Sequence, residues 1–146
     1  MNFKIPVCLF VLALLYTGKL YAQNKHIAKH SGGTTASIVR GKVVYQNICL
    51  ACHMADGKGV PTMNPPLVQT TYVLGDKAAL IKIVLNGFKE DVEINGQTFS
   101  NNMTPHADLK DQQIADVLTY VRKSFGNKAS RVTALEVKKV RAANKK

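Results

Sequence analysis

The chain has 146 residues and a formal net charge of +11, from 20 Lys and Arg against 9 Asp and Glu. This length suits one ordinary domain with short additions and excludes two full cores. Hydrophobic residues at 46% and charged residues at 20% are typical of a globular protein rather than a disordered one. The apolar runs are too short for a membrane-spanning helix, three cysteines are too few for a disulfide framework, and 7% aromatic residues argue against base-stacking surfaces for single-stranded nucleic acid.

Residues 1–22 have the pattern of a secretory signal peptide. Lys4 gives a basic start, residues 7–15 form a continuous apolar run, and a small residue precedes the expected cut. The alternative is an uncleaved membrane anchor, for which the run is short. Removal of this segment also removes Cys8 and leaves two cysteines. We therefore predict export, with a periplasmic location in a bacterium.

The mature chain is expected to begin with a flexible linker over residues 23–35, which hold a Ser-Gly-Gly stretch and no hydrophobic periodicity. Partial helical spacing of apolar residues predicts a first helix from about Ser37 to Ile48. Residues 55–75 contain three glycines and three prolines, and this composition predicts a loop.

Two further helices are expected after this loop. Asp76 is a suitable cap for the second helix, which ends at Gly87. Asp111 is a suitable cap for the third, which closes at Gly126. Asn95-Gly96 signals a tight turn in the otherwise irregular segment between them. The predicted fold is a small all-α protein with long loops, and long loops in a compact domain need something to hold them.

One motif carries specific chemistry: Cys49-Leu50-Ala51-Cys52-His53 has the spacing of covalent c-type haem attachment. Two thiols three positions apart near the end of a helix lie on one side and can reach both vinyl groups of one porphyrin, and His53 then projects toward the iron. The alternatives are a structural zinc site, which needs four ligands, a thioredoxin-like pair, which needs a βαβ context, and a short stapling disulfide. The motif favours one covalently attached haem c with its iron.

A six-coordinate haem needs a second axial ligand, which is commonly methionine. The first methionine is lost with the signal segment, and Met54 adjoins the motif histidine, so it cannot cross the ring. Met103 lies in a polar, irregular stretch just before the third helix, where a loop can cover the open face of a porphyrin. We therefore favour Met103, with Met63 in the proline-rich loop, His106 or an open position as alternatives.

Over about residues 36–127 the sequence resembles the class I soluble cytochromes c, as found in bacterial mono-haem members. The resemblance rests on the haem-attachment motif, on Gly41 and Tyr45, on Pro65-Pro66-Leu67, on Met103, and on residues 109–121.

The resemblance implies a small cytochrome c fold, with three or more helices and long loops wrapped around one covalently bound haem. It implies that Gly41 lets the first helix approach the last one near Tyr120, where the alternative is only a weak point in a helix. It also implies that a carbonyl of the proline stretch, expected at Pro65, accepts the second ring N–H of His53. The alternative is that the prolines only stiffen their loop.

The sequence departs from the family pattern in two places. Many members have proline directly after the ligand methionine, whereas Thr104 intervenes here before Pro105. The segment from Glu93 to Asn102 is longer than in minimal members. Both departures concern the course of the loop around Met103.

Iron held by histidine and methionine has no vacant position for a substrate, so it exchanges single electrons and does not catalyse a reaction of its own. We predict a carrier between redox proteins, with a dehydrogenase or membrane complex as donor and an oxidase or reductase as acceptor, and no nucleic-acid partner. The alternatives are a fixed haem subunit of a periplasmic dehydrogenase complex and a haem enzyme or gas sensor with an open iron site.

The positive charge gathers toward the ends of the chain. Residues 36–127 carry nine basic and eight acidic residues, whereas residues 128–146 carry seven basic residues and Glu136 alone. We expect residues 128–146 to be a solvated, frayed tail whose deletion leaves the haem spectrum unchanged. The alternative is a tail that attracts an acidic partner or makes weak contact with an anionic membrane surface.

Overall fold

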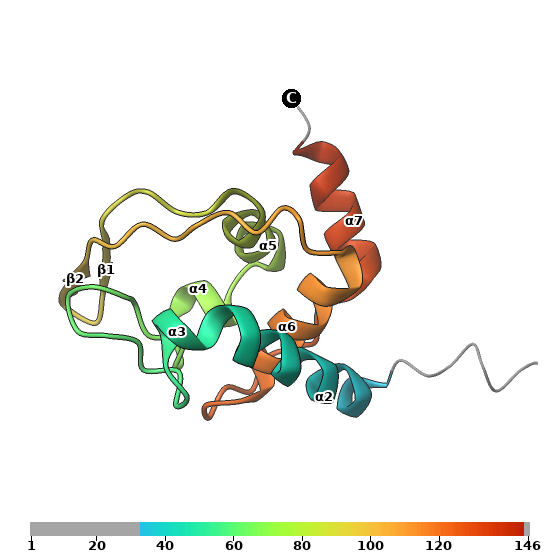
Figure 1. Ribbon diagram of the computed structural model, residues 1–146, viewed down its shortest axis with the longest axis horizontal. Coiled ribbons are helices and arrows are strands. Elements are labelled where there is room, and N and C mark those ends of the chain that lie inside the picture. The colour runs from blue at the N-terminus through green and yellow to red at the C-terminus, as the bar shows by residue number, and fades with distance from the viewer. Residues whose placement is uncertain (1–32, 145–146) are drawn as a thin grey trace, which may run out of the picture. The chain divides into compact units, whose positions relative to one another are not determined.

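Helices and one two-stranded hairpin make up the computed structural model, which describes residues 33–144 (Figure 1). The expected signal peptide (1–22) and most of the expected linker (23–35) lie outside the described residues. Within them, no helix is long and apolar enough to cross a membrane. The elements in chain order are α2 (Thr34–Val44), the π-helical segment η2 (Tyr45–Cys49), α3 (Leu50–His53), α4 (Thr71–Leu74), α5 (Lys77–Asn86), β1 (Val92–Ile94), β2 (Gln97–Phe99), α6 (Asp111–Lys123) and α7 (Ala134–Ala143).

The first helix is longer than predicted, because α2, η2 and α3 follow one another without a break. It crosses α6 at Gly41, where a Cβ atom would lie 2.0 Å from the Asp116 carbonyl oxygen and 2.8 Å from the Tyr120 Cβ. No side chain fits in that space, so glycine is required for the two backbones to approach this closely. The close crossing of the first helix and α6 that the family resemblance implied is confirmed.

A buried carboxylate fixes the same crossing. Asp116 is 2% exposed and accepts hydrogen bonds from Ser37 Oγ at 2.6 Å and Gln112 Nε2 at 3.0 Å. Arg40 adds a two-pronged ion pair, with 2.7 Å and 2.9 Å between its nitrogens and the two carboxylate oxygens. These charge-assisted bonds set the register of α2 on α6, and a buried carboxylate requires partners of this kind.

The helix boundaries confirm one predicted cap and shift another. Asp76 caps α5 by accepting a hydrogen bond from the Ala79 backbone N–H at 2.7 Å, and Gly87 follows the helix with φ 73°. The cap of α6 is Lys110 rather than Asp111, and the Gln113 side chain accepts from its backbone N–H at 3.0 Å. The predicted third helix is confirmed, although its cap lies one residue earlier and the helix ends at Lys123 rather than near Gly126.

The segment predicted as irregular contains the hairpin of β1 and β2. Val92 pairs with Phe99, and Asn95 and Gly96 form the two-residue turn with φ values of 54° and 75°. Both values are positive, as the favoured hairpin turn requires. The predicted turn is confirmed, and the two strands beside it are additional to the prediction. Val92, Ile94 and Phe99 form a small apolar cluster with Phe88.

The expectation of a frayed tail is wrong, because residues 134–143 form helix α7. Val132 and Val137 are 2% and 0% exposed and belong to the main core, and α7 packs on α5 and α6. Thr133 caps the helix by accepting a hydrogen bond on Oγ1 from the Glu136 backbone N–H at 3.3 Å, and its own backbone N–H donates to the Glu136 carboxylate at 2.7 Å. Lys138 and Lys139 are exposed and directly follow the buried Val137, and the high charge of the segment gives no sign of the buried valines. The compact unit therefore extends beyond residue 127.

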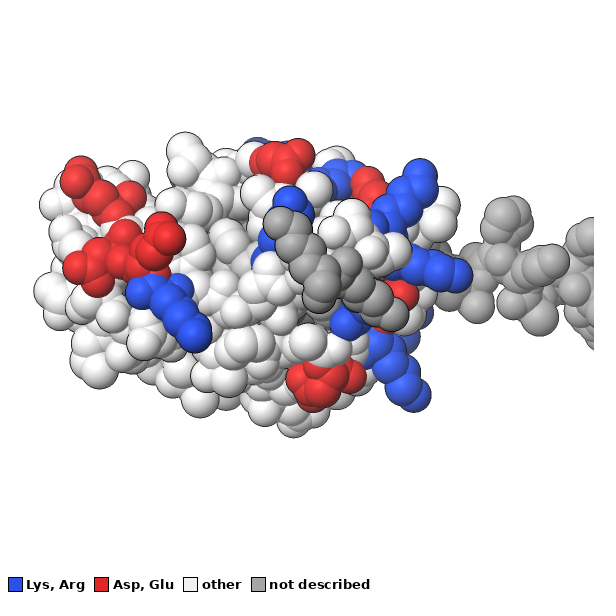
Figure 2. Space-filling view, turned by 90° about the horizontal axis from the view of Figure 1, so that it is seen from above, with Lys and Arg blue, Asp and Glu red and all other residues white. Residues whose placement is uncertain are grey.

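Charge is distributed unevenly over the described surface. Figure 2 shows acidic side chains gathered at the end of the molecule that carries the hairpin, and lysines and arginines mainly at the opposite end. The hairpin end holds the exposed Glu90, Asp91 and Glu93, and α7 presents the exposed Lys138 and Lys139.

Candidate functional site

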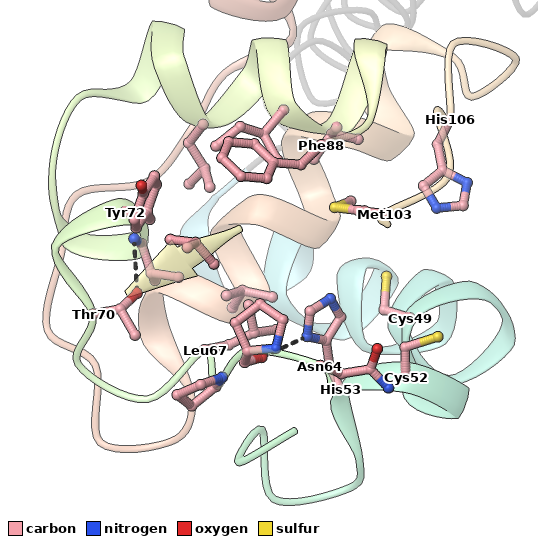
Figure 3. Close-up of a pocket in the computed structure, with 18 of the residues that line it drawn as sticks. Cys49, Cys52, His53, Asn64, Leu67, Thr70, Tyr72, Phe88, Met103 and His106 are labelled. Atoms are coloured by element: carbon pink, nitrogen blue, oxygen red, sulfur yellow. Dashed lines mark hydrogen bonds between the residues drawn. The ribbon is translucent and has the colours of Figure 1, made fainter. Parts of the chain in front are cut away.

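The core encloses a largely apolar cavity between the first helix, α5, α6 and the loops that join them (Figure 3). Its walls come from segments far apart in the sequence, so no single run of residues predicts the cavity. Val92 and Ile94 extend one wall from the hairpin. The principal apolar lining residues are Leu67, Val73, Leu80, Val84, Phe88 and Leu118.

The two motif cysteines lie on one side of this cavity. Cys49 ends η2 and Cys52 lies in α3, and Figure 3 shows both sulfurs beside the cavity. Both thiols are free of disulfide bonds. Burial, with a smaller contribution from Cys52, raises the pKa of the Cys49 thiol to about 11, so this thiol is protonated at neutral pH. The pair therefore offers two unused thiols to one molecule in the cavity.

His53 ends α3, and its ring lies beside the cysteines with one nitrogen hydrogen-bonded to the loop (Figure 3). Nδ1 lies 3.1 Å from the Pro65 carbonyl oxygen. A carbonyl can only accept, so Nδ1 carries the proton and Nε2 is left with a free lone pair. Burial lowers the pKa of His53 despite this hydrogen bond, which favours the neutral imidazole that a metal ion requires. The expected bond between His53 and Pro65 is confirmed.

A glycine places the Pro65 carbonyl. Gly59 has φ 67°, and a Cβ atom on it would lie 2.2 Å from the Asn64 carbonyl oxygen and 2.7 Å from that of Pro65. The Gly59 backbone N–H also donates to the His53 carbonyl at 3.2 Å. The loop thus folds back on the end of α3, and glycine is needed for this close approach.

The hydroxyl group of Tyr45 supports the same helix end. It donates a 2.6 Å hydrogen bond to the Met54 carbonyl, directly after His53. Burial raises the pKa of Tyr45, which keeps this hydroxyl protonated and able to donate. The ring, 1% exposed, contacts Tyr120 and Phe125.

Met103 lies on the opposite side of the cavity from His53 (Figure 3). Its backbone N–H donates to the Phe88 carbonyl at 2.8 Å, and the Phe88 N–H donates to the Met103 carbonyl at 3.1 Å. Gly87 makes this bridge possible, because a Cβ on it would lie 2.3 Å from the Met103 carbonyl oxygen. The thioether is thus presented by a loop fastened to the end of α5.

The structure separates the other candidates for the second axial position. Met63 is 51% exposed and is not among the residues that line the cavity. His106 does line the cavity, at its edge beyond Met103 in Figure 3. Among the sequence candidates, Cys49, Cys52, His53 and Met103 are therefore brought together around one cavity, with His106 at its edge and Met63 outside it.

A zinc site finds no support in the described part of the chain. Across residues 33–144, no three side chains of His, Cys, Asp or Glu come together as a metal site. Four such ligands would be needed for structural zinc.

The residues present fit a porphyrin. The cavity offers apolar walls, a neutral imidazole and a thioether on facing sides, and two free thiols on one side. Imidazole and thioether are the donor pair typical of electron-transfer haem iron. This combination of donors and apolar lining has no use in a purely structural core.

Sequence reasoning missed two parts of the site. The hairpin wall could have been found from the alternating residues on both sides of Asn95-Gly96. Arg122, 3% exposed, donates to the carbonyls of Val73 and Gly75 and so holds α4 beside the cavity. No sequence pattern predicts that role, since Arg122 cannot be distinguished in the sequence from an ordinary charged residue near a helix end.

Comparison with known proteins agrees with this geometry. A sequence profile of the cytochrome c family matches residues 38–125. Cytochrome c-552 of Thermus thermophilus is 34% identical over 121 residues, which cover 76% of this chain and 80% of that protein. A second cytochrome c-552 of Thermus thermophilus is 36% identical over 104 residues, or 64% of this chain and 79% of the relative.

Cytochrome subunits of dehydrogenases are similar as well. The cytochrome c subunit of the quinone alcohol dehydrogenase of Gluconobacter oxydans is 32% identical over 134 residues, which cover 82% of this chain but only 27% of that subunit. The match over residues 38–125 spans more than half of the chain and includes the cysteine pair, the histidine and Met103. The chain therefore belongs to the cytochrome c family as a bacterial class I c-type cytochrome that binds haem c covalently and functions in electron transfer.

Proposed function

We propose that Cys49 and Cys52 attach the haem and that His53 and Met103 are its two axial ligands, in a carrier that passes single electrons between redox proteins. The observation that carries this proposal is the placement of His53 and Met103 on facing sides of one apolar cavity, beside two free thiols. With both axial positions filled, the site has no room for a substrate, and members of this family are typically electron carriers rather than enzymes.

Each of these residues has a definite task. The haem iron supplies a one-electron couple when bound. The Pro65 carbonyl accepts a hydrogen bond from Nδ1–H of His53, which holds the ring in one orientation and makes Nε2 a better electron donor. The apolar walls exclude water, and the backbone bridge between Met103 and Phe88 holds the thioether in place. A rigid site of this kind needs little rearrangement when the electron arrives or leaves.

Bacterial c-type cytochromes are typically exported, and we propose the periplasm as the location of this chain. The similar proteins include both cytochrome c-552 and cytochrome subunits of dehydrogenases, and these correspond to two roles. We propose the free carrier, because the match to the Thermus thermophilus cytochrome c-552 covers 80% of that protein.

The ligand assignment is tested by Met103→Ala in the haem-loaded protein. We expect the long-wavelength absorption band of methionine-bound ferric haem to disappear and the reduction potential to fall, because the thioether favours ferrous iron. Met63→Ala is the matched control, since Met63 is exposed and outside the cavity, and it should keep both properties. A wild-type spectrum in Met103→Ala would refute the assignment.

The two roles are separated by affinity purification of the tagged chain from its native host. A free carrier is recovered as a single haem-bearing polypeptide. Recovery in a stable, stoichiometric complex with a large dehydrogenase would instead favour the subunit role.

A further inference from the structure

The last turn of α7, taken together with its C-cap residue Asn144, contacts both chain segments that hold Met103. One of these is the end of α5, which leads through Gly87 to Phe88 and its backbone bridge with Met103. The other is residues 104–110, which lead from Met103 to α6.

Arg141 makes the contacts with the second segment. Its guanidinium donates from Nη1 to the Ala107 carbonyl at 2.7 Å and from Nη2 to the Leu109 carbonyl at 2.6 Å. Its Nε donates to Asp111 Oδ1 at 2.7 Å, so the cation is paired at the start of α6. The planar guanidinium therefore binds three acceptors within a stretch of five residues. Because this group is rigid, it loses little conformational entropy when it forms these hydrogen bonds.

Asn144 makes the contact with the first segment. Its side-chain amide forms a reciprocal pair with that of Asn86, at 2.6 Å and 3.2 Å. Asn86 is the last residue of α5 and directly precedes Gly87, which touches the Met103 carbonyl. The same turn of α7 therefore fastens the chain on both sides of the bridge between Phe88 and Met103.

We infer that the last turn of α7 is a clasp that keeps the Met103 loop closed, with Arg141 as a positioning residue for the methionine ligand. This inference rests on the proposed function, since it requires Met103 to be the ligand. The segment 104–110 has one further backbone anchor to α5, from the His106 N–H to the Val84 carbonyl at 2.9 Å. Loss of the Arg141 fork leaves two carbonyls without their charged partner and lowers the cost of moving the loop away from the cavity.

The test is a titration of the ferric, haem-loaded protein with imidazole, which must displace the methionine to bind. Arg141→Gln should bind imidazole about tenfold more tightly than the wild type, which corresponds to about 1.4 kcal/mol. Arg141→Lys keeps the positive charge but not the planar guanidinium, so its imidazole affinity should lie between those of the wild type and Arg141→Gln.

Glu136→Gln is the matched control at the other end of α7. It removes the 2.8 Å ion pair with Lys77 but retains a side chain able to cap the helix, and it touches nothing near Met103. It should lower the global free energy of unfolding while leaving imidazole affinity unchanged. Equal gains in affinity for Arg141→Gln and Glu136→Gln, or no gain in either, would overturn the clasp.

A double variant separates the clasp from the ligand assignment. Met103→Ala removes the competing thioether, so adding Arg141→Gln to it should give no further gain in imidazole affinity. A full tenfold gain in that background would show that Arg141 acts elsewhere, and the clasp would be refuted. If Met103→Ala alone leaves the spectrum and the imidazole affinity at wild-type values, the ligand assignment itself has failed.

Discussion

Single residues with no chemistry of their own determine the site as much as its ligands do. Gly59 is the clearest case, because a side chain there would collide with the carbonyl that orients His53. Gly41 has the same role at the crossing of α2 and α6. The family resemblance predicted Gly41, whereas Gly59 was only one of several glycines in a loop. A glycine that permits close backbone approach cannot be distinguished by sequence from one that only allows a turn.

Gly59→Ala should displace the Pro65 carbonyl and weaken its hydrogen bond to His53. A less basic histidine stabilises ferric iron less, so we expect the reduction potential to rise, together with a loss of stability of about 2 kcal/mol from clash and backbone strain. Gly96→Ala is the control, because Gly96 also has a positive φ of 75° but open space around it. Voltammetry and thermal unfolding of both variants provide the comparison, and an equal potential in the two would contradict this role of Gly59.

Asp116→Asn should weaken the crossing of α2 and α6. The amide keeps the size of the side chain but loses the charge that Arg40 and Ser37 recognise, and half of its head group now donates. We expect the free energy of unfolding to fall by roughly 2 kcal/mol, measured by denaturant titration of the haem-loaded protein. The absorption spectrum should stay unchanged, since Asp116 does not line the cavity. A changed absorption spectrum in the fully folded variant would contradict this expectation and show that the crossing of α2 and α6 affects the haem.

At the scale of elements, the sequence predicted those whose signals are local. The Asp76 cap, the Gly87 end and the Asn95-Gly96 turn each depend on neighbouring residues, and the structure contains all three. Helix α7 was missed because it is stabilised by contacts with residues far away in the sequence. Val137 is buried against the main core, whereas its neighbours Lys138 and Lys139 are exposed. Charge counts over a segment do not reveal which face of a helix is covered.

The cavity, too, could be predicted from the sequence only where its signals are local. The motif predicted Cys49, Cys52 and His53 from spacing alone, and Met103 followed from elimination and from the family resemblance. The hairpin wall could have been predicted from the alternating residues beside Asn95-Gly96, whereas the bond from Arg122 to the Val73 carbonyl joins residues about fifty positions apart. Such contacts arise only when the chain is folded.

Truncation after residue 128 should destabilise the domain, contrary to the expectation for a frayed tail. It removes Val132 and Val137, which are 2% and 0% exposed, and it uncovers the faces of α5 and α6 beneath them. Burial of each valine contributes about 1.5 kcal/mol or more, so the free energy of unfolding should fall by several kcal/mol. Denaturant titration of the truncated, haem-loaded protein measures this loss. Unchanged stability would contradict the packing of α7.

Glu136 makes the anchoring of α7 dependent on pH. Burial alone would raise its pKa, but the hydrogen bonds from Lys77 and Thr133 outweigh burial and lower the pKa to about 2. A carboxyl whose pKa is depressed by folding stabilises the protein above its unfolded pKa and loses that contribution as pH falls toward its folded pKa. The stability of the wild type should therefore decrease between about pH 4.5 and pH 2 more steeply than that of Glu136→Gln. Parallel profiles of unfolding free energy against pH would contradict this coupling.

At the scale of the whole molecule, the charges are separated along the described domain. Acidic residues gather at the hairpin end and basic residues mainly at the end that carries α7 (Figure 2). Such a separation orients a molecule as it approaches a charged partner, and salt weakens the effect. The sequence places the excess of positive charge toward the ends of the chain, and the fold adds that acidic residues gather at the hairpin end.

The exposed lysines of α7 should affect encounter rather than the haem. In the double variant with Lys138→Gln and Lys139→Gln, we expect slower electron exchange with an acidic redox protein at low salt and wild-type exchange at high salt. Stopped-flow kinetics at two ionic strengths measures this, with the absorption spectrum as a check that the site is intact. If the wild type and the double variant exchange electrons at the same rate at low salt, this end of the molecule does not face such a partner.

The central claim is that one haem is joined to Cys49 and Cys52, and intact mass spectrometry tests it most directly. The protein should be produced together with a haem-attachment system and measured under denaturing conditions, which release any haem that is not covalently bound. We predict the mass of the polypeptide plus one haem for the wild type, and the bare polypeptide for the double variant with Cys49→Ala and Cys52→Ala. A wild-type chain that shows only its polypeptide mass under these conditions would contradict the account.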